Sequence, residues 1–294
     1  MLFIIQAFIF FTGCILFAAY LSLYERKLIG KIQLRRGPNQ CGVFGLLQPI
    51  ADTIKICLKR SAMKGYPKSV IFAIFLLFST SLLQLSLIPI AYNFVLWNPK
   101  GSIFIVILLH TIIVFAETMI GVLSNSRFGV IGGVRAYLQT VASNIPYILA
   151  LIVMMLMYDS INLFDIAHSE SRIGFILKIP LFVICFINLL MVCNKIPFDF
   201  PEAESELVAG AYVEYGGILF GLIYLSDYLN LTFQSSLLST LFFGKFTIIN
   251  TIIFITIVIL IRAILPRYKQ NQMLRIAWTL LSPMLVALIL LLSW

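Results

Sequence analysis

Charged residues are scarce in this chain of 294 residues, and their scarcity excludes most soluble folds. Asp, Glu, Lys and Arg make up 11% of the sequence, whereas hydrophobic residues make up 61% and the mean hydropathy is +1.03. Soluble domains carry roughly 25% charged residues, because they need a hydrated surface around the core. The apolar residues also lie in long runs, which predicts that lipid surrounds the chain.

The sequence also lacks the closely spaced ligands that metal centres require. None of its five cysteines forms a Cys-x-x-Cys pair, and none lies in a cluster with histidine, so no zinc or iron–sulfur site is indicated. The glycines in 129–133 follow no strand and match no phosphate-binding pattern. We therefore expect this chain to bind no cofactor. The cysteines are interpreted as small core or lipid-facing residues: Cys14, Cys41, Cys57, Cys185 and Cys193.

What the chain has instead is a series of apolar segments, each long enough to cross a bilayer, which takes about 20 residues. The sixth is the weakest, because Glu214 and Asp227 lie within it. We expect an all-α integral membrane protein, a bundle of about eight transmembrane helices in a single domain, 1–294. The segments are 2–24, 70–92, 103–124, 136–158, 173–193, 213–231, 247–265 and 276–294.

The basic residues indicate which loops share a side of the membrane. Most Lys and Arg fall in alternate loops, 25–69, 125–135, 194–212 and 266–275. Positive charge concentrates on the cytoplasmic or matrix side of membrane proteins, so these loops are predicted to lie on that inner side. Both termini then lie on the opposite side.

The first inner loop contains an amphipathic pattern over residues 44–58. Leu47, Ile50, Ile54 and Leu58 recur at helical spacing, and Pro49 suits a first helical turn. This pattern predicts a helix lying in the membrane interface. A loop helix packed on a partner protein is the alternative.

The third inner loop carries an unusual density of acids. Pro201 favours a helix start, and Glu202 and Glu206 would then lie one turn apart on one face. Like charges at that spacing repel, which favours the binding of a proton, as a proton path requires. A solvated acidic loop is the alternative. The acids are Asp199, Glu202, Glu204, Glu206 and Glu214.

Other ionisable residues lie within or beside the apolar segments, where charge is costly and therefore informative. Glu25 and Arg26 end the first segment, and Arg135 opens the fourth. Glu117 lies inside the third. His110, in the same segment, is interpreted as a hydrogen-bonded packing residue.

The loop motifs resemble a known family along the whole chain. They are similar to those of membrane subunit 1 of NADH:quinone oxidoreductase, respiratory complex I, which is called the H subunit in bacteria. The longest matches are ERKLIG at 25–30, QLRRGPN at 33–39, GLLQPIAD at 45–52 and EAESELV at 202–208. Shorter ones occur at 124–126, 135, 197–199, 213–215, 262–263 and 266–267.

The resemblance implies that the chain is a subunit of a proton-translocating NADH:ubiquinone reductase without a redox centre of its own. Its implied partners are other complex I subunits, especially the quinone-site subunits of the peripheral arm and small neighbouring membrane subunits, together with lipids and the substrate quinone. FMN and the iron–sulfur clusters are implied to lie only in partner subunits. The implied residues of the quinone chamber and its access route are Arg26, Arg35, Arg36, Ala51, Asp52 and Ile54. The implied proton-coupling path consists of Glu25, Asp52, Arg135, Glu202, Glu204, Glu206, Glu214 and Asp227.

The sequence departs from the family pattern at four charged positions. Asn144 and Val192 stand where the family usually has Glu, so the path has two fewer protonatable groups. Lys195 replaces an Arg, and Asp227 replaces a Glu of the same charge. Glu117 could compensate as an additional buried acid, or proton coupling is altered.

Two alternatives to this function remain open from the motifs. One is the homologous membrane subunit of an energy-converting hydrogenase. The other is a secondary transporter, which the pattern disfavours because the acids gather at one inner loop and not at mid-membrane. The Ile- and Phe-rich composition favours the mitochondrial inner membrane, with a bacterial plasma membrane as the alternative.

Overall fold

A computed structural model describes residues 2–59, 66–89, 95–169, 175–201, 204–207, 210–244 and 247–293, and every regular element in these ranges is helical. Each of the expected apolar segments contains a helix, so the all-α membrane fold is confirmed. The helices are α1 (Leu2–Ile32), α2 (Gln48–Leu58), α3 (Lys68–Leu85), α4 (Ser102–Val122), α5 (Arg127–Tyr158), α6 (Leu163–His168), α7 (Phe175–Val192), α8 (Glu204–Leu207), α9 (Ile218–Phe243), α10 (Thr247–Ile264), α11 (Gln270–Arg275) and α12 (Ser282–Ser293), with a π-helical segment, Ile276–Leu281, joining the last two.

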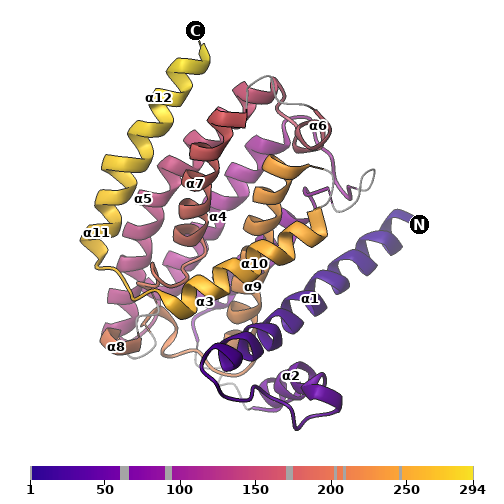
Figure 1. Ribbon diagram of the computed structural model, residues 1–294. Helices are drawn as coiled ribbons and strands as arrows, with labels where there is room; N and C mark the ends of the chain where they lie inside the picture. The colour runs from indigo at the N-terminus through magenta and orange to yellow at the C-terminus, as the bar shows by residue number, and fades with distance from the viewer. Residues whose placement is uncertain are drawn as a thin grey trace.

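Five helical stretches in the described part are long and apolar enough to cross a membrane. They are Ile4–Ile32, Lys68–Leu85, Ser102–Val122, Arg127–Tyr158 and Gln270–Leu292, and α7 and α10 contribute shorter apolar helices. In Figure 1, α2 and α8 lie at the lower end of the bundle, while α6 and the C terminus lie at the upper end. Helices α2 and α8, which belong to two loops predicted to lie on the inner side, thus lie at the same end of the bundle.

Helix α9 is largely enclosed by protein and carries many buried polar residues. It packs against α1, α2, α3, α6, α7 and α10. Its outer half carries buried hydroxyl and amide side chains, including Gln234, Ser235 and Ser239. Many of the hydroxyls donate to backbone carbonyls three or four residues earlier in the helix, so their burial leaves few donors unsatisfied.

The predicted boundaries of this helix were wrong at both ends. The helix begins at Ile218, since Gly217 before it adopts φ 59°, a conformation that glycine tolerates and that interrupts a helix. Glu214 therefore precedes the helix and does not lie in a membrane span. At the other end the helix continues to Phe243, through polar residues that the sequence pattern assigned to an outer loop.

The boundaries of α5 also differ from the prediction. The helix begins at Arg127, where the Ser126 hydroxyl accepts the Gly129 N–H at 3.0 Å as an N-terminal cap. Arg135 therefore lies inside the helix and does not open it. At this end α4 and α5 touch backbone to backbone, because a Cβ on Gly121 would lie 2.4 Å from Gly133 Cα.

Candidate functional site

Helices α1, α2 and α9 enclose a cavity of about 180 Å³ at the inner end of the bundle. Two of the chamber residues that the sequence resemblance implied, Arg26 and Asp52, line this cavity. The cavity is largely apolar, with a few polar groups at one edge, as is usual for small-molecule sites. Its lining residues are Ala18, Ala19, Ser22, Arg26, Pro49, Asp52, Thr53, Ile56, Cys57, Ile218, Gly221, Leu222, Tyr224, Leu225 and Tyr228.

Helix α2 presents a different face to the cavity from the one that its apolar stripe suggests. Pro49, Asp52 and Ile56 line the cavity, whereas Ile50 and Ile54 point outward and are about half exposed, at 45% and 53%. The outward stripe leaves apolar surface for lipid or for another subunit. Neither Ala51 nor Ile54 is among the lining residues of this cavity.

The polar edge of the cavity is an ion pair between α1 and α2. Arg26 Nη1 donates to Asp52 Oδ2 at 2.9 Å, and Gln48 Nε2 donates to Asp52 Oδ1 at 2.9 Å. Both carboxylate oxygens of Asp52 are thus occupied. The pair holds α2 against α1 and places a cation at the cavity edge.

A second, polar cavity of about 690 Å³ adjoins the first through Arg26, which lines both. Arg35, Arg36 and the loop from Gly37 to Gln40 form most of its wall. Gly45 holds this loop tightly folded, because its φ is 73° and a Cβ there would lie 2.2 Å from Pro38 O. The three implied chamber arginines are therefore brought together.

Glu25 links α1 to α9 and α10 behind the apolar cavity. It is 5% exposed, and its two carboxylate oxygens have different partners. Tyr228 Oη donates to Oε2 at 2.5 Å, and Arg262 forms an ion pair with Oε1. A buried carboxylate with a cationic partner and a hydroxyl donor is well compensated.

Hydrogen bonds connect Glu25 back to the cavity through two tyrosines that the sequence analysis did not single out. The Tyr224 and Tyr228 hydroxyls lie 3.0 Å apart, and Tyr224 also interacts electrostatically with Arg26. Their spacing of four residues on one helix, on either side of Asp227, is the pattern that could have revealed them. A polar route therefore runs from Asp52 through Arg26 and both tyrosines to Glu25.

The route continues beyond Glu25 on the inner side. Arg262 also interacts electrostatically with Asp199, and Arg267 Nη2 pairs with Asp199 Oδ2 at 3.0 Å. Asp199 is 6% exposed. Motif residues from the first, third and fourth inner loops thus form one charged cluster.

The remaining acids of the third inner loop have separate partners. Glu206 forms an ion pair with Arg135 of α5, and the Glu206 side chain is 61% exposed. Glu202 and the side chain of Glu204 lie outside the described residues. The predicted pairing of Glu202 and Glu206 on one helix face therefore stays a prediction.

Glu214 ties the segment before α9 to the turn between α4 and α5. Its Oε2 accepts the Asn125 N–H at 2.8 Å, and its carbonyl accepts from Tyr66 Oη at 2.5 Å. Burial, followed by the charge of Glu214, raises the pKa of the Tyr215 phenol. Tyr215 therefore stays protonated and donates to Ile120 O at 2.6 Å.

Asp227 lies in α9 among charges from other helices. Cys193, at the end of α7, interacts electrostatically with Lys195, Glu117 and Asp227, so these groups share one neighbourhood. Lys195 Nζ also lies 5.3 Å from the centre of the Tyr228 ring. In the part of the chain that the structure describes, no group of three or more His, Cys, Asp or Glu side chains could hold a metal ion.

Comparison with known proteins agrees with the loop motifs. Residues 5–293 match the family model described as NADH dehydrogenase. The H subunit of the NADH-quinone oxidoreductase of Magnetococcus marinus is 32% identical over 286 residues, covering 91% of this chain and 83% of that protein. The corresponding H subunits of Rickettsia peacockii and Paramagnetospirillum magneticum are 33% and 34% identical, covering 96% and 90% of this chain and 90% and 83% of theirs.

These relatives also bear on the membrane in which the chain resides. They are bacterial, which fits the plasma-membrane alternative and gives no support to the mitochondrial inner membrane that the composition favoured. The match over nearly the whole length, the helical membrane fold and the clustering of the loop motifs lead to one conclusion: the chain belongs to the NADH dehydrogenase family, as a membrane subunit of the type known as the H subunit in NADH-quinone oxidoreductase.

Proposed function

We propose that this chain forms the membrane side of the quinone chamber of NADH-quinone oxidoreductase and begins the charged path that couples quinone reduction to proton translocation. The observation that carries the proposal is the series of polar side chains from Asp52 at the cavity edge, through Arg26, Tyr224 and Tyr228, to Glu25 in the interior. The relatives' shared name supplies the reaction.

The apolar cavity between α1, α2 and α9 admits the quinone tail, and the polar cavity beside it receives the head group. Arg26 lines both cavities, so a molecule with an apolar tail and a polar head would span them at this residue. Arg35 and Arg36 line the polar cavity on its open side. Their forked donors suit carboxylates of a peripheral-arm subunit.

The path beyond the chamber relies on tyrosine hydroxyls, each of which can donate and accept a hydrogen bond. When Glu25 takes up a proton, its attraction for Arg262 weakens and the Tyr228 hydroxyl is free to reorient toward Tyr224. Protonation of Glu25 therefore changes the interactions of Arg26, through the two tyrosines, and those of Asp199, through Arg262. Glu206, Glu214 and Asp227, with Glu202 and Glu204, extend the path toward neighbouring membrane subunits.

FMN and iron–sulfur clusters belong, in this proposal, to partner subunits, and quinone is the substrate that this chain helps to bind. Helix α1 is mostly exposed, since only 11% of its most apolar stretch is buried, and its outer surface is offered to lipid or to a small membrane subunit. The bacterial relatives favour a plasma membrane.

The replacement Glu25→Gln tests the proposal, because glutamine keeps the size of the side chain but cannot ionise. In membranes that contain the assembled complex, quinone reduction and proton translocation should fall at least about tenfold. Oxidation of NADH by an artificial acceptor, which bypasses the chamber, should survive. Asp165→Asn in α6 is the matched control and should leave all three activities unchanged. Normal quinone reduction and translocation in an assembled Glu25→Gln complex would contradict the proposal.

A further inference from the structure

Helix α4 carries two ionisable side chains that the charged path described above does not use. His110 and Glu117 are 4% and 6% exposed, although they lie in one of the most apolar helices of the chain. Seven residues separate them, which corresponds to about two turns, so both point to the same face of the helix. Buried ionisable groups in a membrane-crossing helix are costly and mark functional positions.

His110 faces the first of the two positions at which the chain lacks an expected acid. Its Nε2 lies 3.0 Å from Asn144 Oδ1 on α5. Because an amide oxygen only accepts hydrogen bonds, Nε2 carries the proton and Nδ1 is the acceptor of a neutral ring. Nδ1 is buried without a hydrogen-bond partner among the described residues. The ring can therefore take up a proton at Nδ1 and give it back from the same atom, while Nε2 stays hydrogen-bonded to Asn144.

Glu117 lies at the second such position. Asn194 Nδ2 donates to Glu117 Oε2 at 3.3 Å, two residues after Val192. Cys193, between them in sequence, interacts with Glu117, Lys195 and Asp227. The Glu117 carboxylate of α4 thus lies close to Val192 of α7, where an acid is missing. Lys195 and Asp227 lie in the same neighbourhood.

We propose that α4 supplies the two protonatable groups that α5 and α7 lack, with His110 in place of an acid at Asn144 and Glu117 in place of an acid at Val192. This inference rests on the proposed function, since it assigns further residues to the same coupling path. The backbone contact between Gly121 and Gly133 brings α4 close enough to α5 for such an exchange. Asn144 then acts as a positioning residue that fixes the imidazole ring.

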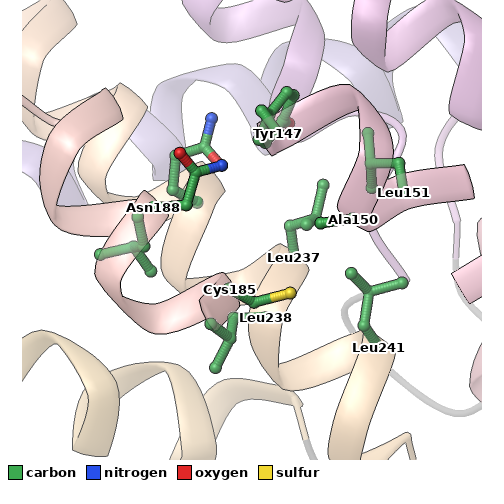
Figure 2. A pocket seen from close by; sticks show the side chains of 10 residues that line it. Tyr147, Ala150, Leu151, Cys185, Asn188, Leu237, Leu238 and Leu241 are labelled. Atoms are coloured by element: carbon green, nitrogen blue, oxygen red, sulfur yellow. The ribbon is translucent and has the colours of Figure 1, made fainter. Parts of the chain in front are cut away.

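A small cavity lined by Tyr147, the residue whose ring packs on His110, suits the water that a proton route needs. The Tyr147 ring packs on the His110 ring with centres 4.6 Å apart, and Tyr147 also lines a cavity of about 30 Å³. Figure 2 shows Tyr147 of α5, Asn188 of α7 and leucines of α9 around this cavity.

Two polar atoms at this cavity make a bound water favourable. Tyr147 and Gln234 interact across the cavity, yet neither Tyr147 Oη nor Gln234 Nε2 completes a hydrogen bond in the described part of the chain. A water molecule needs roughly 10–15 Å³ of such volume and several polar partners. Both conditions are met here, which extends the polar surroundings of His110 toward α9.

The test measures protons translocated per quinone reduced in membrane vesicles that contain the assembled complex. His110→Gln and Glu117→Gln remove the ionisable groups and keep hydrogen-bonding capacity. Each should lower translocation at least about tenfold, while NADH oxidation by an artificial acceptor is retained. His168→Gln, at the only other histidine of the sequence, and Asp165→Asn are the matched controls and should leave translocation unchanged.

Double variants separate a protonic role from a packing role. His110→Gln with Asn144→Glu, and Glu117→Gln with Val192→Glu, return an acid to the neighbouring helix and should restore translocation. If a single variant fails to assemble, the corresponding double variant decides. A double variant that assembles and translocates protons supports the exchange, and a double variant that fails to translocate protons overturns it.

The result that overturns the inference differs from the one that overturns the proposed function. Normal translocation in His110→Gln and Glu117→Gln, alongside loss in Glu25→Gln, rejects the exchange and leaves the coupling role of the chain intact. A loss in His110→Gln that Asn144→Glu does not repair also rejects it.

Discussion

At the scale of single residues, Glu25 is distinguished by having a different kind of donor on each carboxylate oxygen. The Arg262 guanidinium is a permanent charge, whereas the Tyr228 hydroxyl can turn away and bond elsewhere. The tyrosine is therefore the adjustable partner. It is also the side chain that joins the interior carboxylate to the cavity, through Tyr224.

The replacement Tyr228→Phe should break this connection while keeping the ring that packs under Lys195. A buried hydrogen bond to a charged group is worth about 1.5–3 kcal/mol, so quinone reduction coupled to translocation should fall roughly tenfold or more. The measurement is proton uptake during quinone reduction by the assembled complex. Tyr137→Phe, on the exposed face of α5, serves as control. Equal activities in the two variants would show that the hydroxyl is not part of the path.

The family resemblance pointed to several residues that lie together in the structure, but not to their partners. Arg26, Arg35, Arg36 and Asp52 were implied by the loop motifs, and the structure places all four at the two adjoining cavities. The pairing of Glu25 with Arg262 joins residues 237 positions apart. No local spacing encodes such a contact, because it depends on how the helices pack.

At the scale of elements, the length and hydropathy of the apolar segments predicted where helices occur. The predicted helix ends were wrong where polar residues continue a helix. Helix α9 was cut short because its Ser, Thr and Gln residues resemble a loop, yet they are buried against neighbouring helices. The stripe of α2 was correctly predicted as helical. Its outward orientation could not be predicted, because an interfacial helix has two environments in which apolar residues are stable.

The contact between α2 and α9 gives a prediction about the width of the apolar cavity. Gly221 of α9 lines the cavity, and a Cβ there would lie 3.1 Å from Ile56 Cγ2 of α2. Gly221→Val should therefore narrow the cavity and raise the KM for long-tailed quinone several-fold more than for a short-tailed analogue, since only the long tail occupies the cavity. Gly216→Val, at a position with nothing within 4 Å of the added Cβ, is the control. The same KM change for both quinones would argue against a tail-binding cavity.

At the scale of the whole molecule, both cavities are lined by residues of α1 and α2. Helix α2 lies at the lower end of the bundle in Figure 1, the end that is predicted to face the inner side. The polar cavity there is the larger, and its wall is a loop, 33–40, that lies beyond the end of α1. An open arginine-rich cavity at the protein surface suits an acidic partner better than a lipid tail. The inner end of the bundle is therefore where we expect the peripheral arm to attach.

Arg35 provides the test of this attachment. Its Nε donates to Gln33 Oε1 at 2.8 Å, which orients the guanidinium group at the wall of the polar cavity. Arg35→Ala removes a forked donor without touching the buried path, so it should weaken retention of the peripheral arm during purification and raise the KM for quinone several-fold. Arg127→Ala removes a cation from the same side of the membrane but outside the cavity, and should leave both measurements unchanged. If Arg35 only anchors the loop to lipid head groups, the two variants will behave alike, because a single exposed charge contributes little to either measurement.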